Sequence, residues 1–178
     1  MNNQLSESFD LDKTLPYSKL TPINTKRLLR NFFKSVYSID DDMLDDVLKN
    51  IKNGYLISEK DEILLFTVEN SDSVEYHFIN LTQKIDRGQT NSLGKTSTIL
   101  FSTIIKIILD NLNTAKEVHI RTEENRVKLY SKIMKVVLSK HAPNWEVKEI
   151  EKVMDGVKNI ILKSKRLSSP LFERLFRK

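Results

Sequence analysis

The feature that most constrains the fold is the order of strand and helix patterns between Tyr76 and Val137. A strand-like run, YHFINLT, is followed by a polar loop with two glycines and by a long apolar helix pattern, TILFSTIIKIILDNL. A short strand pattern, EVHIRT, and a second helix pattern come next. A loop that leaves a strand and enters a helix presents unpaired backbone N–H groups and the positive end of a helix dipole, which bind phosphate. The order therefore predicts a site for a phosphate-bearing cofactor.

Helices and strands are also predicted before this region. Phe9 to Leu20 has an extended pattern, and Thr21-Pro22 begins an amphipathic helix. Three aspartates cap a second helix, which Asn53-Gly54 ends and whose predicted buried stripe is Met43, Leu44, Val47, Leu48 and Ile51. Three strand patterns follow, YLISE, EILLFTVE and VEYHFINLT, and the short polar turns between them predict an antiparallel meander.

The last elements form a hairpin, and the whole chain fits one α+β domain. Residues 145–154 and 157–162 flank Asp155-Gly156, a pair typical of type I′ turns, in which both central residues have positive φ. A length of 178 residues suits a single domain, predicted over 1–163. The predicted order is β-α-α-β-β-β-α-β-α-β-β.

Composition excludes several classes of site. The chain has no cysteine, which removes disulfides, thiol catalysis and cysteine-based zinc sites. The three histidines lie on separate elements without metal-ligand spacing, and the aspartate run at 40–42 complements a helix dipole, so no metal is expected. Polar residues interrupt the apolar stretch from Ile99 to Leu112, so no membrane span is expected. The N-terminus does not resemble a signal peptide, and we expect a cytoplasmic protein.

The formal charge is concentrated at the C-terminus. Residues 163–178 contain six basic residues and one acidic residue, which equals the whole net charge of +5. We interpret 164–178 as a basic amphipathic tail that either packs on its own domain or docks on a protein partner, with nucleic acid as a less favoured partner. The candidate docking residues are Arg166, Leu171, Phe172, Arg174, Leu175, Phe176 and Arg177.

The element order resembles that of the GNAT acyltransferase superfamily over roughly residues 9–163. In that fold the fourth and fifth strands separate, and acyl-CoA lies in the gap with its pyrophosphate on the loop that opens the third helix. The resemblance implies acetyl-CoA or another acyl-CoA as cofactor. The corresponding cofactor-binding residues are Asn91, Leu93, Gly94, Lys95 and Thr96, of which Gly94 matches the family's Gln/Arg-x-x-Gly-x-Gly/Ala pattern and Asn91 and Thr96 differ.

The same loop has two other interpretations. Five residues separate Gly88 from Gly94, whereas a P-loop has four, and an inserted residue would disrupt the nest of N–H groups around a phosphate. The other interpretation is a solvated loop with a helix cap.

Catalysis in such a fold needs a base that takes a proton from an amine and an acid that protonates the departing thiolate. Leu129-Tyr130 matches the family's Leu-Tyr pair, so Tyr130 is the candidate acid or, alternatively, a core tyrosine. The candidate bases are Glu75 and His77, which strand alternation places on one face, and His119 on the next strand. An ordinary exposed strand face accounts for the same residues.

Two functions from different classes remain open. One is a divergent acyl-CoA-dependent acyltransferase that acts on an amine or a protein. The other is a catalytically silent GNAT-like binding or assembly module that docks a partner through its tail. The bias toward Lys, Asn and Ile is typical of AT-rich genomes such as those of low-GC bacteria and their phages, so a virion protein would suit the second function.

Overall fold

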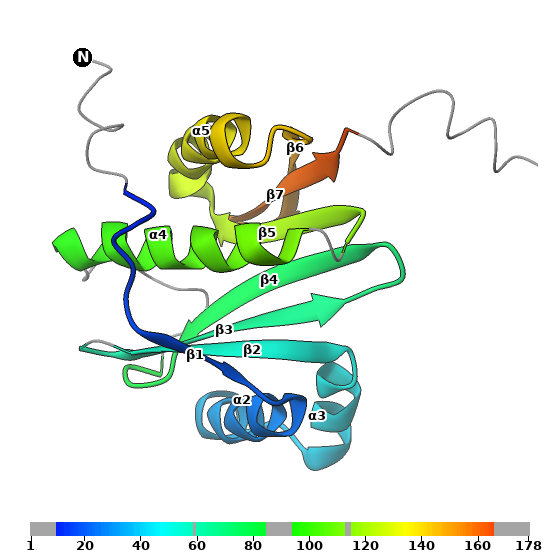
Figure 1. Ribbon diagram of the computed structural model, residues 1–178. Helices are drawn as coiled ribbons and strands as arrows, with labels where there is room; N and C mark the ends of the chain where they lie inside the picture. The colour runs from blue at the N-terminus through cyan, green and yellow to red at the C-terminus, as the bar shows by residue number, and fades with distance from the viewer. Residues whose placement is uncertain (1–9, 59, 85–93, 113–114, 166–178) are drawn as a thin grey trace, which may run out of the picture.

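The computed structural model of the chain describes residues 10–58, 60–84, 94–112 and 115–165. Its elements follow the predicted order (Figure 1): β1 (Tyr17–Leu20), α2 (Pro22–Tyr37), α3 (Asp41–Leu48), β2 (Ile51–Ser58), β3 (Glu62–Glu69), β4 (Ser73–Asn80), α4 (Gly94–Asn111), β5 (Glu117–Glu123), α5 (Glu124–His141), β6 (Trp145–Met154) and β7 (Val157–Ser164). The predicted α+β class is confirmed. The docking residues of the tail lie outside the described residues.

The strands form one seven-stranded sheet in the order β1-β2-β3-β4-β5-β7-β6. β2, β3 and β4 make the predicted antiparallel meander, and β1 pairs antiparallel with β2 as well. β4 and β5 then pair in parallel, and β5, β7 and β6 pair antiparallel. One parallel pair therefore joins two antiparallel halves.

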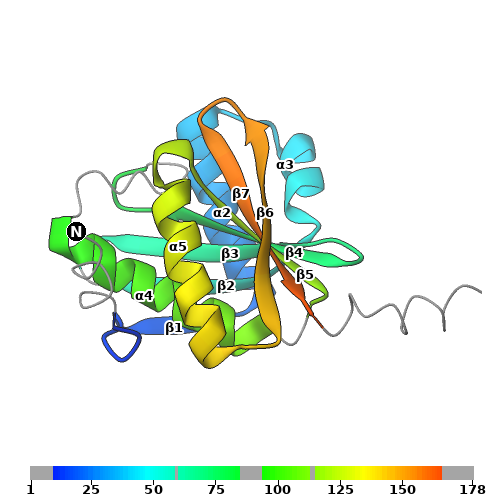
Figure 2. The ribbon, with the colours of Figure 1, turned by 90° about the horizontal axis from the view of Figure 1, so that it is seen from above.

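Helices cover both faces of this sheet. α4 and α5 lie on one face and α2 and α3 on the other, as Figures 1 and 2 show. The larger core lies under α4 and α5 and takes residues from β2 through β7. The smaller core lies under α2 and α3 and contains no described residue of β5, β6 or β7. The α2–α3 layer thus covers only the β1–β4 half.

The parallel pair between β4 and β5 is short. Ser73–Tyr76 pairs with Glu117–Ile120, and the two strands are not paired with each other beyond these residues. β4 continues to pair with β3, and β5 continues to pair with β7. In Figure 1 the two strands diverge from their paired end, so the sheet opens between His77 on β4 and Arg121 on β5.

The second helix differs from the prediction. α3 ends at Leu48, and Ile51 begins strand β2 instead of extending the helix. Met43 and Val47 were expected in the buried stripe but are 63% and 52% exposed. A helix of eight residues presents only one narrow stripe, and Leu44 and Leu48 fill it.

Asn53-Gly54 was predicted to end the second helix, but both residues lie in β2, where Gly54 has a packing role. Gly54 lies within β2, where a Cβ atom would come within 2.3 Å of Thr25 Oγ1 on α2. A glycine is therefore needed for the close approach of helix and strand. Thr21, by contrast, caps α2 as predicted, since its side chain accepts a hydrogen bond from the Asn24 N–H.

The predicted hairpin is present, but its turn is not type I′. Gly156 has a φ of 74°, whereas Asp155 is not among the residues with positive φ. Only one central residue therefore needs the left-handed region. None of the helices in the described part of the chain has the length and apolar character needed to cross a membrane.

Candidate functional site

Glu75 and His77 lie on the face of β4 opposite Tyr76, as alternation predicts. Tyr76 is buried in the core under α4 and α5. The side chains of Glu75 and His77 are 16% and 18% exposed, and His77 Nε2 lies 3.3 Å from Glu75 Oε1. The His77 ring stacks on Phe66 of β3, with centroids 5.2 Å apart and an interplanar angle of 13°. The stacking and the carboxylate fix the position of the imidazole.

Arg121 approaches the same carboxylate from β5. Its Nη2 atom lies 2.5 Å from Glu75 Oε1. Register explains the contact, because Glu75 is paired with His119, and Arg121 lies two residues further along the same face of β5. Glu75 Oε1 and Arg121 Nε are nevertheless buried without an aligned hydrogen bond, so charge attraction dominates this contact.

The environment keeps Glu75 ionised. Burial raises the pKa of Glu75. The close contact with His77 and the charges of His77, Arg121 and His119 lower it by more than burial raises it, and the resulting pKa is about 2. A carboxylate with so low a pKa is a poor proton acceptor at neutral pH. Glu75 is therefore a poor candidate for the predicted base, which leaves His77 as the candidate on β4.

A second histidine–glutamate pair lies on β5. His119 Nε2 is 2.6 Å from Glu117 Oε1, and Lys163 Nζ of β7 is 3.0 Å from Glu117 Oε2. Burial raises the pKa of Glu117, but the contacts with His119 and Lys163 lower it below its ordinary value. The His119 side chain is 18% exposed, like that of His77, but it does not line the cavity described next.

A cavity of about 220 Å³ begins where β4 and β5 separate. Three polar residues line it, and two of them, His77 and Arg121, immediately follow the paired segments, with Thr122 as the third. Seven apolar residues form the rest of the wall: Phe33, Val47, Ile51, Phe66, Val68, Phe78 and Val157. The cavity thus combines one imidazole with apolar walls, which is a common composition for a small-molecule site.

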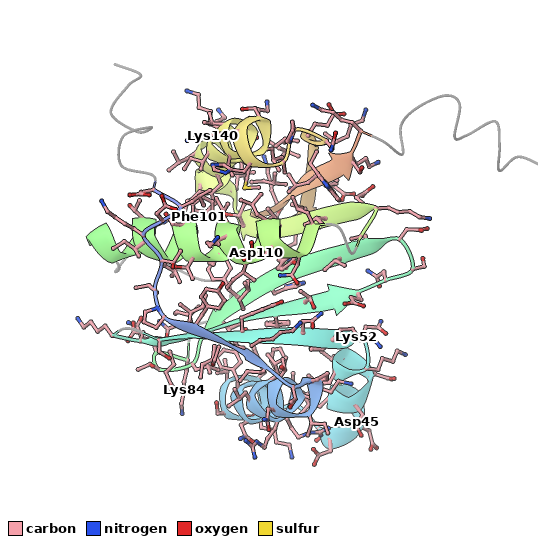
Figure 3. All side chains as sticks on the ribbon, in the orientation of Figure 1. Asp45, Lys52, Lys84, Phe101, Asp110 and Lys140 are labelled. Atoms are coloured by element: carbon pink, nitrogen blue, oxygen red, sulfur yellow. The ribbon has the colours of Figure 1, made fainter. Side chains whose placement is uncertain are left out.

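Tyr130 lies on the other side of the sheet. It is on α5, 7% exposed, and its ring stacks on Phe101 of α4 with centroids 3.8 Å apart. Its hydroxyl accepts a hydrogen bond of 3.3 Å from Arg126 Nη1. Figure 3 shows Phe101 on α4, within the larger core. The sheet therefore separates Tyr130 from His77, and Tyr130 is not among the residues that line the cavity.

The predicted cofactor loop is only partly described. Asn91 and Leu93 lie outside the described residues, and α4 begins at Gly94 with Lys95 and Thr96 in its first turn. No acidic residue lies in that turn. The first backbone N–H groups of a helix have no partner within it, and a turn without acids favours an anion there. The start of α4 is therefore compatible with a pyrophosphate.

The sequence patterns did not identify Arg121 or the apolar residues of the cavity wall as site residues. Alternation places Arg121 on the face of Glu117 and His119, but the register between β4 and β5 is needed to bring it to Glu75. Phe33 and Val47 show only core-like helical spacing in the sequence. Among the described residues, no group of three or more His, Cys, Asp or Glu side chains is placed to hold a metal ion.

The observed element order is the one on which the predicted resemblance to the GNAT superfamily rests. No protein-family model matches the sequence, and no curated protein matches it. Similar solved structures include a Desulfovibrio desulfuricans protein described as a GNAT-family acetyltransferase, with 9% identity and a TM-score of 0.38 over 84% of this chain and 98% of that one.

Two further similar structures derive from the spermidine N-acetyltransferase SpeG of Vibrio cholerae. One is a chimera with hSSAT, with 13% identity and a TM-score of 0.44 over 86% of this chain and 96% of that one. The other consists of mutant forms of SpeG, with 13% identity and a TM-score of 0.42 over 92% of this chain and 100% of that one.

Proposed function

We propose that the protein is an acyl-CoA-dependent transferase that acylates an amine. The observation that carries this proposal is the opening between the parallel strands β4 and β5, with an oriented imidazole at its edge and a cavity beyond. An acyl thioester in the opening would face His77 from one side and α4 and α5 from the other. Gly94 adds no side chain at the start of α4, which supports an adjacent pyrophosphate.

His77 acts as the base in this proposal. An acceptor in the cavity arrives as an ammonium, and its nitrogen must lose a proton before it attacks. His77 holds Nε2 toward the Glu75 carboxylate, 3.3 Å from Oε1, so charge attraction favours the proton on Nε2 and leaves Nδ1 with a lone pair to take the acceptor's proton. His77 then releases the proton to solvent. Glu75 stays ionised because the adjacent His77 and the charge of Arg121 outweigh its burial and hold its pKa far below the ordinary value.

Tyr130 is the proposed acid on the opposite side of the sheet. A bound acyl-CoA supplies an activated acyl group, whose carbon–sulfur bond breaks as the carbon–nitrogen bond forms. Tyr130 donates its hydroxyl proton to the departing sulfur and recovers a proton from the acylated nitrogen. The products are an amide and a free thiol, and one proton has passed through His77 to solvent.

Binding is tested first, because it requires no knowledge of the acceptor. Acetyl-CoA at ~100 times its dissociation constant should raise the free energy of unfolding by ~2.7 kcal/mol in a thermal-shift titration. Acetyl-CoA should also slow hydrogen exchange of the backbone amides of 94–97, and Gly94→Val should weaken its binding. If neither acetyl-CoA nor CoA changes the unfolding temperature or the exchange, the transferase proposal is wrong.

Turnover is tested with two matched pairs of variants. His77→Gln should lower kcat/KM by ~10² to 10⁴, whereas His119→Gln, at an equally exposed histidine beside a glutamate, should not. Tyr130→Phe should lower kcat by a similar factor, whereas Tyr76→Phe, at another buried tyrosine of the same core, should not. Equal effects within either pair would remove the assigned role.

A further inference from the structure

The wall of the cavity carries a chemical restriction on the acceptor. Among the described residues, no carboxylate lines it, and its one permanently charged group is the guanidinium of Arg121. Glu75 Oε1 is shielded behind His77 and Arg121 and has its charge balanced there. A second ammonium group on the acceptor would therefore enter the apolar wall without a counter-charge, which is unfavourable.

The rest of the wall favours an apolar body. Phenylalanine side chains from α2, β3 and β4 surround the space, and the His77 ring continues the aromatic surface through its stack on Phe66. Aromatic walls bind rings and branched alkyl groups through large contact areas and ring edges. A volume of about 220 Å³ is below the ~300 to 1,000 Å³ typical of sites for drug-sized ligands, so the bound body is compact.

We propose that the acceptor is a compact primary amine with a single cationic group and an aryl or branched-alkyl body, and not a polyamine. This inference rests on the proposed function. The amino group lies toward His77, and the apolar body fills the space between β3, β4 and α3. Discrimination against a diamine comes from the lack of a carboxylate among the described residues of the apolar wall.

Val47 provides a way to test this inference without disturbing the core. It lines the cavity but is 52% exposed on α3, so it stands at the mouth. A carboxylate there would supply the counter-charge that the wall lacks. Met43 lies one turn earlier on the same helix and is 63% exposed, but it does not line the cavity, so Met43→Glu is a matched control for charge and helix position.

The experiment measures binding of phenethylamine and of 1,4-diaminobutane to the full-length protein by calorimetry, with CoA present. We expect the wild type to bind phenethylamine at least ~10-fold more tightly, because an unpaired second charge is costly in an apolar wall. Val47→Glu should reduce this ratio by at least ~10-fold, whereas Met43→Glu and the neutral Val47→Gln should leave it unchanged.

Several outcomes would overturn the inference. They are equal or tighter binding of the diamine by the wild type, no binding of either amine, or the same change in ratio for Met43→Glu as for Val47→Glu. The thermal shift with acetyl-CoA is recorded on the same samples. A normal acetyl-CoA shift with diamine preference overturns the acceptor class alone, whereas the absence of any acetyl-CoA shift overturns the transferase proposal and, with it, the role of a bound amine as acceptor.

Discussion

The two faces of the sheet at β4 and β5 differ sharply, although the same two strands build both. On the α4–α5 side, Val74 and Tyr76 of β4 and Val118 and Ile120 of β5 are buried in the larger core. On the α2–α3 side, the intervening residues are charged or titratable and contact one another. One face stabilises the domain, and the other carries the candidate site.

Helix coverage explains the difference. The core under α2 and α3 reaches β4 only through Ile79 and includes no described residue of β5, β6 or β7. Polar side chains on the uncovered part of that face remain near solvent and pair with one another, which avoids the cost of isolated buried charge. The comparison teaches that the candidate site lies where the α2–α3 core ends, at a strand opening that Phe33 of α2 and Val47 of α3 border without filling.

The largest effect is expected from a change on the covered face. Ile105 on α4 is fully buried in the larger core, so Ile105→Ala should lower the free energy of unfolding by about 2–5 kcal/mol through lost burial and a residual cavity. Urea unfolding measures it, with the exposed neighbour Lys106→Ala as control. If His77→Ala destabilises the protein as much as Ile105→Ala, the two faces do not differ in the way described.

The second-largest effect is expected in the pH dependence of the free energy of unfolding, to which Glu75 contributes. Its pKa is lowered from 4.5 to about 2 on folding, so the unfolded state binds more protons between these values. The stabilisation is present above pH about 4.5 and is lost as pH falls toward about 2, at about 1.4 kcal/mol per pH unit. Unfolding of wild type and Glu75→Gln across this range should show a steeper fall for the wild type. Parallel curves would mean that the site does not hold Glu75 ionised.

A smaller loss of stability is expected from a change at the contact between α2 and β2. Gly54→Ala should cost about 1–3 kcal/mol, because its Cβ would overlap Thr25 Oγ1 and Cγ2 and push α2 away from β2. Combining it with Thr25→Ala removes both of these atoms and should recover part of the loss. Additive losses in a double-mutant cycle would show that the contact between α2 and β2 is not the cause.

The smallest effect is expected from the tail. Deletion of 166–178 should leave the unfolding temperature nearly unchanged if this segment docks on a partner, and should abolish co-purification with that partner. A fall of several degrees would place Leu171, Phe172, Leu175 and Phe176 in the domain core instead, since each such buried side chain contributes about 1.5–3 kcal/mol.

Much of the fold could be predicted because it follows from local patterns. The apolar run EILLFTVE and the alternation in VEYHFINLT predicted strands, helical patterns predicted α2, α4 and α5, and short polar turns predicted the meander of β2, β3 and β4. The error at α3 has a physical cause, because apolar residues at helical spacing can also be exposed on a short helix. Met43 and Val47 satisfy the pattern, but α3 buries only Leu44 and Leu48.

The candidate site divides between what the sequence determined and what the tertiary structure decided. Alternation is a property of the strand itself, so the sequence alone placed Glu75 and His77 on one face of β4. Three features depend on register and on helix packing instead. They are the contact of Glu75 with Arg121, the opening after Tyr76 and Ile120, and the apolar wall from α2, α3 and β7. These are set by contacts between segments distant in the chain, and no local pattern encodes them.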